Sequence, residues 1–158
     1  ELPPYCVVGR DENGGYRVIK TALVTEALEA EGTTVKVNKS HLFAVGDFVT
    51  VGGGLKGASD KITAIDKSNA GYDVITLEAT IGAAKVGQVL VGVKEKTTAG
   101  KATLVTSSSE LVITLSKVDL TVANQSCGLM VRGTISEGNM PFPIDAGLKA
   151  LMPLIRFV

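Results

Sequence analysis

A glycine-rich loop, Gly52-Gly53-Gly54-Leu55-Lys56-Gly57, is the most suggestive place for chemistry in this chain. It satisfies the G-x-G-x-x-G pattern that cradles the pyrophosphate of a dinucleotide, and Asp73 lies near the spacing of the ribose-binding acid. Such a site needs a helix that begins at the loop, because the amides of its first turn hold the phosphates. Here Ala58-Ser59-Asp60 leads directly into another strand pattern. We therefore predict a hairpin loop whose exposed residues are Gly52, Gly53, Gly54, Lys56 and Gly57.

His41 is the one histidine of the chain, so an imidazole base or metal ligand depends on it. The sequence places it in a turn beside Lys39 and Ser40, with no cysteine or acid at ligand spacing. We expect an exposed turn histidine whose replacement by glutamine is nearly neutral for folding and for binding.

Three aspartates, Asp60, Asp66 and Asp73, could meet at a hairpin edge and hold Ca²⁺. Their spacing differs from that of a Ca²⁺ loop, and acids in turns usually cap their own backbone. We expect neither a metal nor another cofactor. Cys6 and Cys127 are predicted to be free thiols, although a single disulfide between them stays open.

Other short motifs are weaker. Ser107-Ser108-Ser109 lacks the G-x-S-x-G elbow of a serine nucleophile. Asn38-Lys39-Ser40 and Asn124-Gln125-Ser126 are formal N-glycosylation sequons, which matter only in a secreted eukaryotic protein. No constellation for catalysis remains, so we expect that the chain is not an enzyme.

The amino-acid composition limits the classes of partner that the chain is expected to bind. The chain has 158 residues, 45% of them hydrophobic and 20% charged, with 16 basic and 16 acidic side chains. This balance suits a folded domain and argues against nucleic-acid or acidic-membrane binding. No apolar stretch approaches the roughly 20 residues of a membrane-spanning helix, and no signal peptide is visible, although one could have been removed. The absence of tryptophan also weakens the case for stacking on sugars or bases.

Period-two alternation of apolar and polar residues predicts a mainly β fold. Five strands are expected in a small antiparallel barrel or sandwich module spanning 33–95, around 33–38, 47–51, 61–66, 72–77 and 87–93, with a hairpin between the third and the fourth. The segment 23–31 is ambiguous between helix and strand. Residues 1–32 are assigned to an N-terminal arm and the first β elements.

Residues 96–158 are predicted to be a β-rich region with one short helix, packed with the rest as one compact unit. Strand patterns occur at 110–115, at Leu120 and Val122, and from Leu129 to Ile135. Apolar residues at helical spacing, from Ile144 to Met152, predict a helix before a final strand at 154–158. Asp145 could cap this helix or lie in its first turn, where an acid favours the helix dipole.

The C-terminal forty residues resemble the lambda-type decoration proteins of phage heads. The resemblance rests on Val118-Asp119-Leu120-Thr121, then Cys127 to Ile135, and then Asn139-Met140-Pro141-Phe142-Pro143 before Ile144 to Val158. The middle of the chain resembles phage or prophage head fibre proteins, through segments such as Ile62-Thr63-Ala64-Ile65-Asp66 and Tyr72 to Leu77. The two likenesses together touch about two thirds of the chain.

The resemblance implies a virion structural protein that stabilises or ornaments a phage or prophage head. It implies a homotrimer bound to the major capsid protein, assembled in the bacterial cytoplasm and carried on the virion. The alternative is a bacterial β-sandwich adhesin or carbohydrate-binding module. A highly apolar tail, 148–158, supports self-association.

By position, Leu2-Pro3-Pro4-Tyr5 matches the N-terminal arm that orders on the capsid in decoration proteins. Two prolines restrict this segment to extended geometry, so it would lose little entropy on docking. We expect exposed side chains at Leu2, Pro3, Pro4 and Tyr5 that bind the capsid, in a segment that the fold does not need. A frayed terminus without a role is an equally weighted alternative.

Overall fold

The structure, a computed structural model, describes residues 1–107, 110–122 and 125–158. It is mainly β, as the alternation predicts. In chain order the strands are β1 (Val7–Arg10), β2 (Tyr16–Val18), β3 (Thr21–Leu23), β4 (Thr34–Val37), β5 (Phe48–Val51), β6 (Ser59–Asp66), β7 (Asp73–Leu77), β8 (Val89–Val93), β9 (Leu111–Thr114), β10 (Leu129–Met130), β11 (Gly133–Ile135) and β12 (Ile155–Phe157). The described helical elements are the 3₁₀ turn η2 (Glu137–Asn139) and the helix α1 (Ala146–Ala150).

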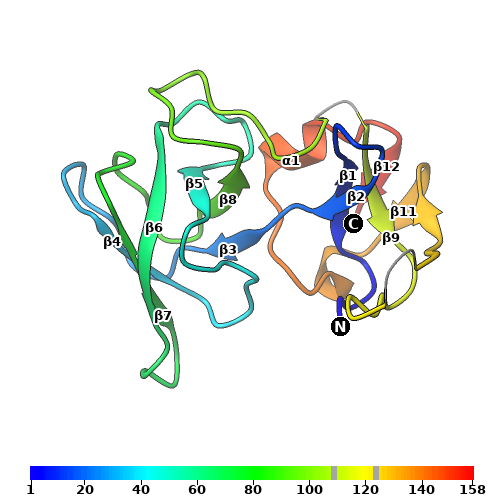
Figure 1. The fold of residues 1–158 in the computed structure, drawn as a ribbon, viewed down its shortest axis with the longest axis horizontal. Coiled ribbons are helices and arrows are strands. Elements are labelled where there is room, and N and C mark those ends of the chain that lie inside the picture. The colour runs from blue at the N-terminus through cyan, green and yellow to red at the C-terminus, as the bar shows by residue number, and fades with distance from the viewer. Residues whose placement is uncertain (108–109, 123–124) are drawn as a thin grey trace.

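Strands β3 to β8 form one antiparallel sheet in the order β3-β8-β5-β6-β7-β4, which we call the six-stranded module (Figure 1). Its two outer strands meet, because Val24 and Val37 form a bridge and the amide of Thr25 donates to the carbonyl of Lys36 at 2.9 Å. The sheet therefore curls around an apolar interior. Alternate residues of β4 and β7 are buried, which is the period-two burial that the sequence predicts.

Both ends of the chain build the second module. Strand β1 pairs with β2 and with β9, giving a four-stranded antiparallel sheet in the order β10-β9-β1-β2. Strands β11 and β12 form a separate parallel pair. Parallel neighbours need a crossover connection, and here the segment carrying η2 and α1 supplies it.

The core joins the two modules. One buried cluster fills the six-stranded module and includes Val35, Val49, Ile62 and Leu90. A second cluster combines Val89 and Val91 of β8 with residues of β9, β11, β12 and α1. Helix α1 lies between the modules (Figure 1), and its Leu148 is fully buried in this second cluster. The chain therefore packs as one unit, with a core shared across the predicted boundary near residue 95.

Several local expectations need correction. The five strands predicted within 33–95 are present, but the sheet takes a sixth, β3, from before this range. The ambiguous segment 23–31 holds no helix; Val24 and Leu28 form isolated bridges with Val37 and Ala84. Leu120 and Val122 do not form a strand, because the carboxylate of Asp119 accepts hydrogen bonds from the amide and the hydroxyl of Thr121 and fixes a turn.

The helix near the C-terminus forms where predicted but is shorter, Ala146–Ala150. Its N-cap is Asp145, whose carboxylate accepts from the amide of Leu148 at 2.9 Å. Met152 is buried and Leu151 is half-buried, as the helical spacing requires. The final strand also forms, as β12.

Candidate functional site

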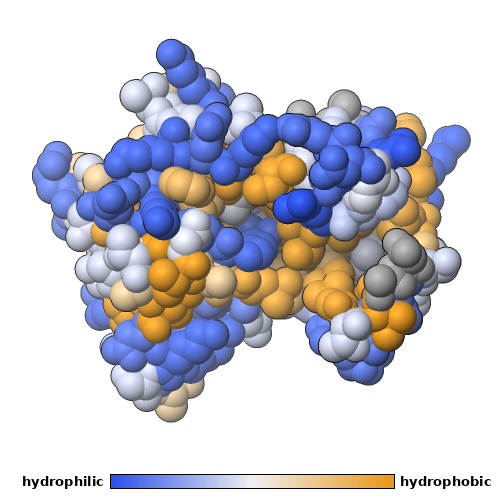
Figure 2. Space-filling view, in the orientation of Figure 1, coloured by the Kyte–Doolittle hydropathy of each residue, from blue (hydrophilic) through white to orange (hydrophobic). Residues whose placement is uncertain are grey.

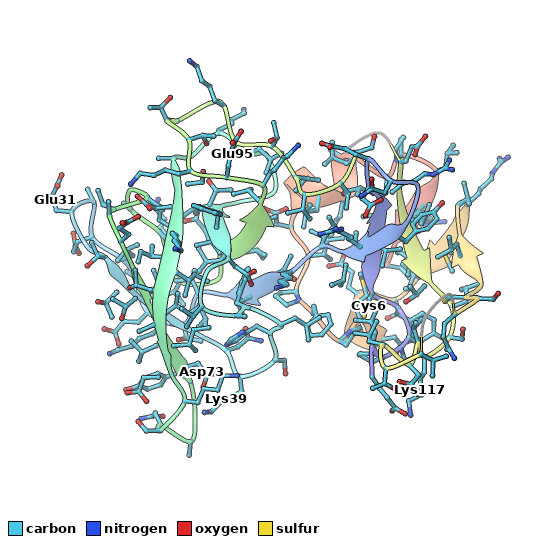
Figure 3. All side chains as sticks on the ribbon, in the orientation of Figure 1. Cys6, Glu31, Lys39, Asp73, Glu95 and Lys117 are labelled. Atoms are coloured by element: carbon cyan, nitrogen blue, oxygen red, sulfur yellow. The ribbon has the colours of Figure 1, made fainter. Side chains whose placement is uncertain are left out.

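His41 is buried, which corrects the expectation of an exposed turn histidine. Its side chain is 0% exposed, and its Nε2 lies 3.0 Å from Oδ2 of Asp73, a carboxylate that is itself 2% exposed. Lys39 completes the cluster with Nζ 2.7 Å from Oδ1 of Asp73. Figure 3 shows Lys39 and Asp73 pointing toward each other at the start of β7. The cluster ties the loop after β4 to the strand that pairs with β4.

Both ring nitrogens of His41 are used by the fold. The backbone amide of Phe43 can only donate, and it reaches Nδ1 at 3.2 Å, so Nδ1 accepts. In the neutral ring Nε2 then carries the proton and donates to Asp73. Burial, partly opposed by Asp73, lowers the pKa of His41 below its ordinary value. No nitrogen is left to act as a base or to ligate a metal.

The three aspartates lie in separate settings and do not meet at one hairpin edge. Asp60 is buried and pairs with Lys96 at 2.9 Å. Asp66 is exposed and accepts from the amide of Ser68 at 2.9 Å. Asp73 belongs to the cluster with His41. Within residues 1–107, 110–122 and 125–158, no group of three or more His, Cys, Asp or Glu residues could hold a metal ion.

The glycine-rich loop docks on α1 instead of standing free. The amide of Gly53 donates to Oδ2 of Asp145 at 2.7 Å, and Gly53 is buried, while Gly54 and Lys56 are exposed. A Cβ on Gly147 would overlap the backbone of Gly53 and Gly54, so the loop and the helix need this glycine to approach so closely. The loop leads into β6, with no helix after it, which removes the geometry of a nucleotide site.

The N-terminal segment is part of the fold. Leu2 is 5% exposed and exchanges backbone hydrogen bonds with Val118 at 2.8 and 2.9 Å. The amide of Tyr5 donates to the carbonyl of Thr114 at 2.8 Å. Pro3, Pro4 and Tyr5 are half-buried. The expectation of an exposed arm is therefore wrong for Leu2, because the side chain packs with Cys6, Val8 and Val112.

The two cysteines are free. Cys6 is buried, and its thiol donates to the carbonyl of Pro3 at 3.1 Å. Burial, with a smaller opposing contribution from a hydrogen bond to Thr114, raises the pKa of the Cys6 thiol to about 12. Cys127 is more exposed, and its thiol lies 3.5 Å from the hydroxyl of Ser116.

The remaining sequence motifs are the serine run and the two sequons. The amide group of Asn38 in the first sequon is engaged, because its oxygen accepts from the amide of Leu23 at 2.8 Å. The amide of Ser107 donates to the carbonyl of Arg10. Ser108, Ser109 and Asn124, on which the nucleophile and second sequon readings fall, lie outside the described residues.

A groove of about 820 Å³ lies between the two modules. Figure 2 shows hydrophobic side chains where the modules meet. Three large apolar residues on it are strongly exposed, Leu120 at 67%, Val122 at 52% and Tyr16 at 50%. The polar residues of the lining include Arg17, Lys20, Asp47, Asp119 and Gln125. We call this surface the inter-module groove. Leu120 and Val122 are visible in the sequence, but their alternation with polar residues predicts a strand, whereas the structure places them in a turn.

A second apolar surface lies on β12. Burial alternates along this strand and the residue on each side of it, with Ile155 buried in the core and Leu154, Arg156 and Val158 exposed. Leu154 and Val158 are 57% and 59% exposed. We call these three outward side chains the β12 face.

Comparison of the chain with protein-family models, with curated proteins and with solved structures found no match. Among the described residues, no helix is long and apolar enough to cross a membrane.

Proposed function

We propose that this chain is a virion structural protein that decorates, or projects from, the head of a phage or prophage, as a homotrimer on the major capsid protein. The carrying observation is the contrast between its polar and apolar groups. His41, Asp60 and Asp73, the buried groups best suited to chemistry, are held in structural pairs. Large apolar side chains meanwhile face solvent on the inter-module groove and the β12 face.

This distribution supports binding without catalysis. Decoration requires a stable fold and surfaces that gain free energy when they are covered, and about 25 cal/mol is gained per Å² of apolar surface removed from water. It requires no activated base, nucleophile or metal. The resemblance of 118–158 to decoration proteins, and of the middle of the chain to head fibre proteins, supplies the capsid as the partner.

The structure changes which residues of the N-terminal segment can contact the capsid. Leu2 is buried under its own module and cannot be a capsid anchor without local unfolding. Pro3, Pro4 and Tyr5 remain half-accessible and stay candidates for capsid contact. On the glycine-rich loop, Gly54 and Lys56 are the accessible candidates, whereas Gly53 is covered by α1.

The experiment is a binding assay with assembled heads of the phage or prophage whose genome carries the gene, prepared without this protein. The purified chain should co-sediment with the heads to saturation and appear as regular density on their outer surface in electron cryo-microscopy. Failure to bind heads, together with binding to a glycan array, would overturn the proposal in favour of the adhesin or carbohydrate-binding module. Heads decorated without measurable glycan binding are the expected result.

A further inference from the structure

The inter-module groove and the β12 face both expose large apolar side chains. The groove is concave and carries Leu120 and Val122 at its rim. The β12 face has one exposed apolar residue on each side of the strand, Leu154 before it and Val158 after it.

Their charges are complementary as well. In the groove, Lys20 pairs with Asp47 at 2.7 Å and Arg17 pairs with Asp11 at 2.8 Å, so these charges are compensated. The carboxylate of Asp119 accepts hydrogen bonds from Thr121 and forms no ion pair with the described residues.

The opposite charge stands on the other surface. Arg156 lies between Leu154 and Val158 on the β12 face, and it is exposed without an ion pair in the part of the chain that the structure describes. Arg132 is exposed beside the same strand pair and is unpaired in the same sense. In the described part of the chain Asp119 thus has no side-chain ion pair, although hydrogen bonds to Thr121 and, in smaller part, the positive N-terminus lower its pKa, and Arg156 and Arg132 have none either.

We propose that the inter-module groove is occupied by the β12 face of a second copy of this chain, with Leu154 and Val158 against Leu120 and Val122 and with Arg156 opposite Asp119. The two surfaces differ, so the contact is heterologous, and its repetition closes a ring when the rotation between copies allows it. The inference deepens the proposed function by naming the contact that holds the oligomer together. It rests on that function only for the number of copies in the ring.

A native thiol makes the contact testable. Cys127 lines the groove, whereas Cys6 is 1% exposed and is shielded from reagents. The variant Leu154→Cys places a second thiol on the β12 face. A short bismaleimide should then link Cys127 of one copy to position 154 of the next, giving covalent oligomers on a denaturing gel. Adding Cys127→Ser should abolish the product.

Val86→Cys is the matched control, because Val86 is 64% exposed but belongs to the six-stranded module and lies outside both surfaces. Cross-linking of Leu154→Cys no stronger than that of Val86→Cys would overturn the proposal. Circular dichroism spectra equal to that of the parent chain establish that each variant is folded.

Charge reversal gives a second and independent measurement. Arg156→Asp should weaken self-association by about tenfold or more in analytical ultracentrifugation, because it sets two carboxylates against each other. Adding Asp119→Asn, whose side-chain oxygen can still accept from Thr121, should restore part of the association because it removes the repulsion, whereas Lys101→Asp, an equal change of charge at an exposed site, should have little effect. A double variant no better than Arg156→Asp would count against the pairing. Both measurements use the purified chain without capsids, so they can fail while head binding succeeds, and the reverse.

Discussion

The carboxylate of Asp145 accepts a hydrogen bond from the backbone amide of Gly53 at 2.7 Å, although the two residues are 92 positions apart. Its other oxygen caps α1 through the amide of Leu148. One side chain therefore closes the N-terminus of the helix and fastens the loop after β5 to it. This polar link joins the two modules in addition to the apolar core that they share.

Replacing Asp145 should destabilise the whole chain. Asp145→Ala removes an N-cap and a charge-assisted hydrogen bond, and we expect the free energy of unfolding in urea to fall by about 2 kcal/mol. Asp145→Asn keeps a good cap and should lose less than half of that. Asp66→Ala, at an exposed turn, serves as the control and should change the free energy of unfolding by no more than about 1 kcal/mol. Equal losses for the alanine and asparagine variants would contradict the role of the cap.

The cap was predictable and its second partner was not. Asp145 precedes a short run of apolar residues at helical spacing, and this local pattern can be recognised from the sequence alone. The strands within 33–95 are equally local, because each alternates over several residues and ends at glycine or a turn. The Gly53 contact depends on how the two modules pack, and no spacing in the sequence encodes that arrangement.

The stability of the folded chain should depend on pH through His41. Its pKa is lowered by burial, below the ordinary value of 6.5, so the unfolded chain binds a proton at a higher pH than the folded chain does. The stabilisation from a neutral His41 is fully present above about pH 6.5 and is lost progressively as the pH falls below it. Urea unfolding at about pH 7.5 and about pH 5.5 measures this loss.

Asp73 acts in the same direction at lower pH. Burial raises the pKa of its carboxyl, but the hydrogen bonds and charges of Lys39 and His41 outweigh burial and lower the pKa below 3.8. Its contribution is therefore present above that value and disappears as the pH falls further.

The variant His41→Gln separates the effect of His41 from general acid denaturation. We expect it to cost about 1–3 kcal/mol near neutral pH, because a buried carboxylate loses one of its donors, and to flatten the decline between about pH 7.5 and 5.5. A slope as steep as that of the parent chain would show that His41 does not set it. The sequence predicts a nearly neutral substitution because it places His41 in an exposed turn, whereas the buried His41 side chain makes the substitution costly.

The errors at His41 and Leu2 share a physical cause. The sequence around His41 is polar and turn-like, and the partner that buries it, Asp73, lies 32 positions away. Leu2 is likewise held by a segment far away in the sequence, because its bridge partner is Val118. Alternation in the sequence does not set the bounds of β1 or β2. In β1 it is absent because this strand is buried on both faces. Local patterns identify elements, whereas these features depend on pairing between distant segments.

The two thiols should differ sharply in reactivity. The Cys6 thiol is buried with its pKa raised to about 12, so little reactive thiolate forms at ordinary pH. Cys127 is accessible in the inter-module groove. Iodoacetamide should modify Cys127 in the native chain and both cysteines in denaturant, as peptide mass spectrometry can show. Rapid native labelling of Cys6 would contradict the packing of the N-terminal segment over it.

That packing also predicts the effect of truncating the N-terminus. Leu2 fills a cluster with Cys6, Val8 and Val112, and its backbone continues the sheet through Val118. Leu2→Ala should lower the free energy of unfolding by about 2–4 kcal/mol, as a leucine removed from a core does. Val45→Ala, at a residue that is 61% exposed, is the control and should be nearly neutral. Deleting residues 1–5 should destabilise the chain at least as much as Leu2→Ala and should expose Cys6 to iodoacetamide. An arm that serves only to bind a capsid predicts the opposite, with full stability, a protected Cys6 and a defect confined to head binding, so chemical denaturation and labelling of the truncated chain decide between the two.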